Sequence, residues 1–412
     1  MSDNDSADPA DTGDGNPRIS QQRSNLTDFV ERCREDACAH GASNEPHPQQ
    51  SGSPIGSLID CSGEGDIIVD TKDLANEVLT DPNGRYSVKG YNERAHHLFG
   101  EIYLGLDKGP EYDRQATRVN SVIQMLSARD AFQAAVQTVR EVLRADPGAT
   151  DVKIIAAVLA SACSRWFDLP DGTLVVPGGG RAGLPVPPAQ CPGDYALPSA
   201  CMFYSCGDEL IGDVARATGA VLKQTHAQYV AQLRAAGKEP KGQLSRAIFE
   251  AFSPAEDDLI ARTIIGVMMG MLPTTYFNLV SVLKSWRANG SNTFCRLQDE
   301  LRQHTGSDPY ARAYSVLAQP MMQAMQGSPM PPEVWRTATQ DHMLGPIQVK
   351  TGDRVVVDIG VVTAADLARG KTDVFTIFGG DRNSLNPPTH ACPGYEVAIA
   401  LMLGTLNGLM EP

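Results

Sequence analysis

The chain has 412 residues, and 42% of them are hydrophobic, which is enough to bury a substantial core in one large domain or two ordinary ones. The formal net charge of −14 argues against a nucleic-acid surface and against a polybasic membrane anchor. The nine cysteines are an odd number and include no Cys-x-x-Cys pair, which argues against a disulfide framework or a zinc knuckle. No apolar run reaches membrane-spanning length and the acidic N-terminus is not a signal peptide, so we expect a soluble, cytoplasmic protein.

The N-terminal region is rich in Ser, Asp, Asn, Gly, Pro and Gln, a composition that cannot offset the entropy lost on ordering. We therefore expect residues 1–54 to be largely disordered, apart from one possible short helix over Asn25–His40. Residues 55–412 are expected to form a single domain. A Pro/Gly-rich segment, Pro170–Pro198, is long for a connection in a compact domain and is expected to wrap the surface or to roof a pocket.

The apolar periodicity of residues 55–412 predicts a mainly α-helical fold with small β-sheets. Strands are expected at Asp66–Asp70 and in a hairpin of Ile347–Lys350 and Arg354–Ile359 joined by Thr351-Gly352-Asp353. The expected helices are Asp73–Leu79, Ser127–Ala145, Asp151–Phe167, Asp208–Ala236, Gln243–Phe252, Ser253–Arg287, Asn292–His304 and Tyr310–Gln326.

The helix expected over Ser253–Arg287 has the clearest start signal in the chain. Ser253-Pro254-Ala255-Glu256 reads as a capping box with proline at the first helical position. At 1.5 Å per residue the helix would span roughly 50 Å and cross the domain. Pro273 in its middle should kink it and open a groove, with the hydroxyls of Thr274 and Thr275 bonding the freed carbonyls. A tolerated kink in a core helix is the alternative.

Two further short stretches contain charged or nucleophilic side chains in distinctive patterns. Pro331-Pro332 is expected to open a helix on which Glu333 and Arg336, three residues apart, share one face and form a buried ion pair. Near the C-terminus, Cys392 lies in a Pro/Gly turn directly before an apolar helical run from Val397 to Leu403.

A cysteine at a helix N-terminus has its thiolate favoured by unpaired N–H groups and by the helix dipole. A thiolate in a dry pocket is a soft ligand, and heme iron is its best-known partner in an oxidising enzyme. The alternative for Cys392 is an ordinary buried cysteine. Cys191 is the rival ligand, because it also lies in a Cys-Pro-Gly turn, but no apolar helix follows it.

These parts, in this order, resemble the cytochrome P450 superfamily. Glu333-x-x-Arg336 resembles the family's ExxR on helix K, Thr389–Ala398 (THACPGYEVA) its heme-cysteine loop before helix L, and Ser253–Arg287 its long central helix I. More weakly, Gly105–Arg118 resembles helix C. The resemblance implies heme b with an axial Cys392 thiolate. It implies cofactor-binding roles for Cys392, His390, Tyr112, Arg114 and Arg118, and structural roles for Glu333, Arg336, Arg382 and Gly394.

The sequence also departs from the family pattern around the cysteine. The usual Phe-Gly-x-Gly is absent, since Leu385 and Pro388 stand where its Phe and its second Gly belong. Phe378-Gly379-Gly380-Asp381-Arg382 resembles the meander's Phe-x-x-x-Arg, but it lies so close to Cys392 that the loop would be shorter than usual. Arg382 is the candidate third member of the Glu-Arg network.

The resemblance implies an oxidoreductase of the monooxygenase type that acts on a small apolar or lipid-like molecule, with Thr274 or Thr275 as the catalytic hydroxyl above the iron. Such an enzyme needs a separate ferredoxin or flavoprotein. Pro273 stands where typical members have Asp or Glu, and Pro cannot relay a proton. A peroxide-driven peroxygenase or hydroperoxide-rearranging relative is therefore one alternative, and a heme-binding protein without turnover is another.

Overall fold

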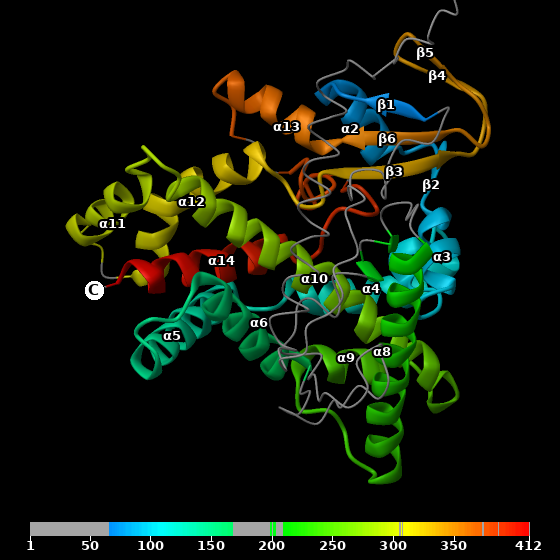
Figure 1. Cartoon of the computed structure of the whole chain (residues 1–412). Coiled ribbons are helices and arrows are strands. Elements are labelled where there is room, and N and C mark those ends of the chain that lie inside the picture. The colour runs from blue at the N-terminus through cyan, green and yellow to red at the C-terminus, as the bar shows by residue number, and fades with distance from the viewer. Residues whose placement is uncertain are drawn as a thin grey trace, which may run out of the picture.

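The computed structural model describes residues 66–167, 198–199, 201–202, 209–304, 306, 308–372, 375–385 and 387–411. The expectations for residues 1–54, for the start of order near residue 55, for most of Pro170–Pro198 and for Cys191 lie outside the described residues. Figure 1 shows the strands gathered at one end of the molecule, with α-helices making up most of the rest.

The main sheet has four strands in the order β1-β6-β3-β2, and a separate two-stranded sheet pairs β4 with β5. In the main sheet β1 runs parallel to β6, and β3 runs antiparallel to both β6 and β2. Glu333 lies directly opposite Asp358 in the β3–β6 register. The strands are β1 (Ile67–Val69), β2 (Tyr86–Ser87), β3 (Glu333–Ala338), β4 (His342–Leu344), β5 (Ile347–Val349) and β6 (Arg354–Asp358).

The helices predicted from apolar periodicity all form, and the short helices α3 and α13 are additional. They are α2 (Lys72–Thr80), α3 (Lys89–His96), α4 (Pro110–Gln124), α5 (Ala128–Ala145), α6 (Asp151–Phe167), α8 (Glu209–Ala235), α9 (Gln243–Ala251), α10 (Asp257–Trp286), α11 (Thr293–Gln303), α12 (Pro309–Gly327), α13 (Ile359–Ala368) and α14 (Tyr395–Met410). The ends lie within one residue of the expected ones, except that α10 begins at Asp257, four residues after Ser253. The 3₁₀ turns η2 (Tyr103–Gly105) and η3 (Pro254–Glu256) complete the described elements.

Helix α10 is the central element of the fold. The predicted capping box forms at its start, where the Ser253 N–H donates to Glu256 Oε2 at 3.1 Å, and Pro273 lies inside the helix. Among the described helices, Pro254–Trp286 alone has the length and apolarity to cross a membrane, but 78% of its most apolar window is buried inside the domain. It is therefore the core helix, packed against α6, α8, α9, α12 and α14.

Helix α14 follows the cysteine turn, as predicted, and packs along α5, as Figure 1 shows. Two glycines permit this close approach. A Cβ on Gly404 would lie 2.4 Å from the carbonyl oxygen of Phe132, and one on Gly408 would lie 2.8 Å from Cβ of Val139. Because a larger residue at either position would force the helices apart, the glycines fix the depth at which α14, and hence the cysteine turn, sits in the core.

Two sequence predictions fail at the sheets. Glu333–Arg336 is not helical, since it lies on strand β3, where Val, Trp and Thr favour the extended chain over a helix. The strands expected at Ile347–Lys350 and Arg354–Ile359 exist, but they do not form a hairpin with each other. The first pairs with β4, and the second joins the main sheet between β1 and β3.

Candidate functional site

A cavity of about 280 Å³ lies between α10 on one side and the cysteine turn with α14 on the other. Its walls are mostly apolar and come from parts of the chain that are distant in sequence, a typical construction for a small-molecule site. Two of these parts are the segment Tyr86–Leu106 and the long helix α10. The first supplies Val88, Tyr91, Tyr103 and Leu104, and α10 supplies Val267, Gly270, Met271, Thr274 and Thr275.

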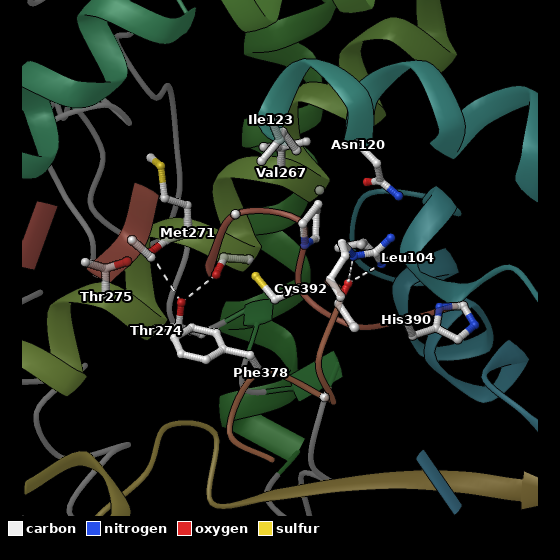
Figure 2. Close-up of a pocket in the computed structure, with 18 of the residues that line it drawn as sticks. Leu104, Asn120, Ile123, Val267, Met271, Thr274, Thr275, Phe378, His390 and Cys392 are labelled. Atoms are coloured by element: carbon white, nitrogen blue, oxygen red, sulfur yellow. Dashed lines mark hydrogen bonds between the residues drawn. The ribbon is translucent and has the colours of Figure 1, made fainter. Parts of the chain in front are cut away.

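Cys392 lies in the wall of this cavity, two residues before Gly394, the N-cap of α14 (Figure 2). Its backbone N–H donates to the Phe378 carbonyl at 2.8 Å, and its sulfur accepts a hydrogen bond from the Gly394 N–H. Burial raises the pKa of the thiol, and the Gly394 N–H and the Arg382 charge oppose that rise. The surface that Cys392 exposes belongs to the cavity, so the sulfur is available to a guest and shielded from bulk water.

Phe378 packs beside Cys392, and Figure 2 shows the two residues next to each other. This corrects the sequence-based alignment of the loop, because Leu385, which was matched to the family's Phe, is fully exposed. Gly379 adopts φ +74°, and a Cβ there would lie 3.2 Å from the His390 carbonyl oxygen. The Phe378–Gly379 turn thus reaches the cysteine turn directly.

Arg382 and Tyr112 hold the backbone of the cysteine turn in place. Arg382 donates from Nε to the Ala391 carbonyl at 2.7 Å and from Nη2 to the Thr389 carbonyl at 3.0 Å. The Tyr112 hydroxyl on α4 donates to the same Thr389 carbonyl at 2.7 Å. Arg382 therefore fixes the backbone of the loop itself. Among the described residues, its side chain makes no hydrogen bond or ion pair with Glu333 or Arg336.

One edge of the cavity is cationic. Arg336, Arg382 and His390 all line it, and the His390 ring packs edge-on against Tyr112 with centroids 5.4 Å apart. Burial, followed by the charges of Arg336 and Arg382, lowers the pKa of His390 to about 3. Arg336 is 7% exposed and donates from Nη1 to the Trp335 carbonyl at 2.8 Å. Within the described residues neither arginine has a carboxylate partner, so this edge suits an anionic group on a guest.

Arg114 and Arg118 are not part of the cavity, which corrects their predicted cofactor-binding role. Arg114 is exposed and pairs with Glu111 and Glu256, and Arg118 pairs with Glu250. Both lie on the solvent side of α4, whereas Tyr112 and Ile123 face inward from the same helix. A helix presents different faces at positions two residues apart, so Tyr112 and Arg114 cannot serve one pocket together.

The predicted ion pair between Glu333 and Arg336 does not form within the described residues. Because side chains alternate along a strand, Val334 and Arg336 face the cavity and Glu333 faces the other side of β3. There, burial and the nearby Asp358 carboxylate raise the pKa of Glu333 to about 7, with Arg354 opposing the rise. The three-residue spacing of Glu333 and Arg336 suggested one face of a helix, so this arrangement was not predicted. The β-branched and aromatic residues between Glu333 and Ala338 were a signal for a strand.

Thr274 and Thr275 both line the cavity from α10, on one side of Cys392 in Figure 2. The Thr274 hydroxyl donates to the Gly270 carbonyl at 2.5 Å, with a longer contact of 3.3 Å to that of Met271. The carbonyl that Pro273 leaves without its helical N–H partner is that of Met269, so the expected repair of the kink by Thr274 is not seen. The Thr275 hydroxyl has no hydrogen-bond partner among the described residues.

Comparison with known proteins identifies the architecture. No family model matches the chain, and no curated protein matches it. Solved structures do: the LnmZ cytochrome P450 hydroxylase from the leinamycin biosynthetic pathway of Streptomyces atroolivaceus S-140 shares 18% identity at a TM-score of 0.58, covering 83% of this chain and 88% of that chain. The chain has the cytochrome P450 fold.

Two further cytochrome P450 structures agree. P450BioI, in complex with an acyl carrier protein ligated to hexadec-9Z-enoic acid, shares 10% identity at a TM-score of 0.61, and 83% of this chain and 84% of that chain are covered. CalO2 shares 16% identity at a TM-score of 0.63, with 86% and 84% covered. At these identities the cytochrome P450 likeness establishes the fold, and the chemistry must be argued from the residues of this chain.

The residues of the cavity fit the heme that the cytochrome P450 fold implies. A heme needs one axial donor, a flat apolar slot and a place for two carboxylates. Cys392 supplies a sulfur that faces the cavity, the walls are apolar, and Arg336, Arg382 and His390 gather at one edge. A single cysteine sulfur is the kind of donor that leaves the other coordination positions of the iron to a porphyrin.

Proposed function

We propose that the protein is a heme-thiolate oxidoreductase, soluble and cytoplasmic, that carries out a monooxygenase-type oxidation of a small apolar or lipid-like molecule. The observation that supports this most directly is the placement of the Cys392 sulfur in the wall of an apolar cavity, opposite the threonines of α10. The cofactor would be heme b, and Cys392 would be the residue that binds its iron. LnmZ, which has the same fold, is a hydroxylase, and this supports the reaction class.

The side chains around the cavity would have different roles in holding the cofactor. Bound iron protoporphyrin with a thiolate ligand activates dioxygen or peroxide for oxygen transfer. Cys392 would lose its proton on ligation, because a metal-bound thiol ionises, and the Gly394 N–H would stabilise the sulfur's negative charge. Arg336 and His390 would hold the propionates, with Arg382 and Tyr112 fixing the turn that carries the ligand. The apolar wall would exclude water from the reacting face.

The two threonines would serve proton transfer in different ways. The Thr274 hydroxyl donates to the Gly270 carbonyl, so its oxygen can still accept a hydrogen bond from a bound oxidant. The Thr275 hydroxyl, without a partner among the described residues, can donate one. Neither replaces a carboxylic acid, since a hydroxyl does not release a proton at neutral pH and Pro273 has no acidic group.

Pro273 favours one alternative, a peroxide-driven peroxygenase. Hydrogen peroxide already carries the protons and electrons that the dioxygen route must collect, so such an enzyme needs less of a proton relay and no redox partner. A dioxygen-using enzyme would need a separate ferredoxin or flavoprotein. Product formation from hydrogen peroxide alone, compared with an electron-donor system under air, distinguishes the two. No turnover with peroxide would remove the peroxygenase alternative.

The substrate class follows from the cavity. Its charged groups gather at the cationic edge, and Thr274, Thr275, Asn120 and Asn278 add polar groups elsewhere in the lining. Most of the remaining wall is apolar, so it favours an apolar molecule of matching shape. The complex of P450BioI with a fatty-acyl carrier protein makes a lipid-like chain one reasonable member of this class. A shift of the ferric spin state on adding such molecules would report their entry, and its absence throughout a broad apolar panel would favour a heme-binding protein without turnover.

The thiolate ligand is tested by the absorption spectrum of the reduced, carbon-monoxide-bound protein. Wild-type protein expressed with ample heme should show the long-wavelength band of thiolate ligation, and Cys392→Ser should lose it. Cys295→Ser, which changes an exposed cysteine, is the matched control and should keep the band. Colourless wild-type protein, or a Cys392→Ser variant with unchanged pigment, would refute the proposed function.

A further inference from the structure

Met271 is the least buried of the described methionines that line the cavity. Of the methionines that line it, Met202, Met325, Met330 and Met402 are each at most 9% exposed, whereas Met271 is only partly buried. The space beside it is open, because a Cβ built on the neighbouring Gly270 would meet no atom within 4 Å. The thioether of Met271 is therefore reachable by a small molecule inside the cavity.

Met271 also lies beside the residues that would face the oxidant. Its carbonyl is within 3.3 Å of the Thr274 hydroxyl, and Figure 2 shows Met271, Thr274 and Thr275 together on α10, to one side of Cys392. A thioether is a soft, polarisable nucleophile that accepts an oxygen atom readily. Proximity in one small cavity raises the rate of such a transfer well above that of a bimolecular reaction in solution.

We propose that Met271 is a self-oxidation site, modified to methionine sulfoxide when the heme-loaded protein meets peroxide without a substrate. This inference rests on the proposed function. In the balanced reaction the O–O bond of hydrogen peroxide breaks and an S–O bond forms at Met271 Sδ. The sulfur loses two electrons, and the other peroxide oxygen leaves as water with both protons. No further reductant or oxidant is needed.

The modification would change the cavity that it occurs in. A sulfoxide is polar and chiral, so it places a strong hydrogen-bond acceptor on a wall that recognises apolar shape. Apolar guests should then bind more weakly, and the cavity should admit more water near Thr274. A bound substrate should protect Met271 by filling the space beside Gly270.

The test is peptide mass spectrometry of heme-loaded protein after short pulses of hydrogen peroxide. Met271 should gain one oxygen at least about tenfold faster in the heme-loaded protein than in heme-free protein. Met125 and Met343, which are 68% and 55% exposed, are internal controls and should oxidise at equal rates in both. Met271→Leu, of similar volume, should keep its affinity for apolar ligands after a pulse that weakens binding in the wild type.

The outcomes separate the two proposals. If the reduced, carbon-monoxide-bound protein lacks the thiolate band, the proposed function fails and this inference falls with it. If the band is present and Met271 stays unmodified while Met125 and Met343 oxidise, the inference alone is overturned. Equal rates at Met271 with and without heme would also overturn it, since the oxidation would then be due to peroxide in bulk solution.

Discussion

The Tyr112 hydroxyl donates a hydrogen bond of 2.7 Å to the Thr389 carbonyl and so ties helix α4 to the turn that carries Cys392. Tyr112→Phe removes this bond and leaves the ring in place. Arg382 still donates to the same carbonyl, so the loss should be about 1 kcal/mol, which corresponds to roughly fivefold faster heme release. Transfer of heme to an excess of apomyoglobin measures that rate.

The control for Tyr112→Phe is Tyr314→Phe, which removes a hydroxyl from a tyrosine that is 47% exposed on α12. Heme release should be unchanged in that variant. Equal release rates in wild type and Tyr112→Phe would show that Arg382 alone secures the turn.

Arg336 should contribute to heme affinity through charge. Arg336→Met keeps much of the side-chain volume and removes the guanidinium, so it should weaken heme binding by roughly 10- to 100-fold, the range for a hydrogen bond to a charged group. Heme dimethyl ester, which lacks the two carboxylates, separates charge from packing. Wild type and Arg336→Met should bind the ester equally well.

Arg114→Met and Arg118→Met are the controls for Arg336→Met, because both arginines are exposed and pair with carboxylates outside the cavity. Neither change should alter heme affinity. If Arg336→Met lowers the affinity for heme and for the ester by the same factor, the side chain acts by packing and the anion-binding role of Arg336 is wrong.

The raised pKa of Glu333 predicts that the free energy of unfolding depends on pH. Its pKa rises from 4.5 to about 7 on folding, so the folded state binds its proton more tightly than the unfolded state does. The resulting stabilisation is complete below pH 4.5 and is lost as the pH rises through 7. At 1.36 kcal/mol per pKa unit the loss is about 3 kcal/mol at most. Glu333→Gln, which cannot ionise, should therefore be more stable than wild type at pH 8 and similar at pH 4.5.

Urea unfolding of heme-free wild type and Glu333→Gln at several pH values between 4.5 and 8 measures this difference. Glu93→Gln, at an exposed position on α3, is the control and should follow the wild-type curve. Parallel curves for wild type and Glu333→Gln would mean that the pKa of Glu333 does not change on folding.

Thr274→Val and Thr275→Val should separate the roles of the two hydroxyls. Thr275→Val removes a hydroxyl with no partner among the described residues, so it should leave stability nearly unchanged and lower the product yield per electron under air. Thr274→Val also removes the bond to the Gly270 carbonyl and should cost about 1 kcal/mol of stability. Coupling ratios, measured as product formed per electron donor consumed, are the readout. Unaltered coupling in both variants would exclude the threonines from proton transfer.

Most of the helical fold could be predicted from the sequence, because its signals are local. Apolar periodicity, the capping box at Ser253 and the Pro/Gly turn before α14 each specify a helix without long-range information. The cysteine turn could be placed for the same reason. The sheets could not, since the short turn between the strands at Ile347 and Arg354 suggested a hairpin. The first strand pairs instead with β4, directly before it in the sequence, and the second pairs with the distant strand β1.

The site was harder to predict than the fold. Arg336 was assigned to an ion pair by its spacing from Glu333, but a strand places the two on opposite faces, and only the three-dimensional structure brings Arg336 to His390. Phe378 was matched to the meander's Phe-x-x-x-Arg, and its contact with the cysteine turn was not predicted, because the residues between Phe378 and Cys392 separate the two in the linear sequence. The contact depends on the backbone turn at Gly379, which a motif match does not detect.

The cationic edge also bears on how the protein is made. At this edge Arg336 and Arg382 lie beside His390, whose lowered pKa keeps its ring neutral, and the cavity around them is mostly apolar. In the newly synthesised polypeptide the two arginine charges therefore repel each other where water is scarce. A porphyrin's carboxylates would relieve that repulsion, and a ligand that binds only the native state raises its population by mass action. Cells short of porphyrin should therefore lose this protein to proteolysis, so that its abundance follows the iron and porphyrin supply even when its transcript is constant.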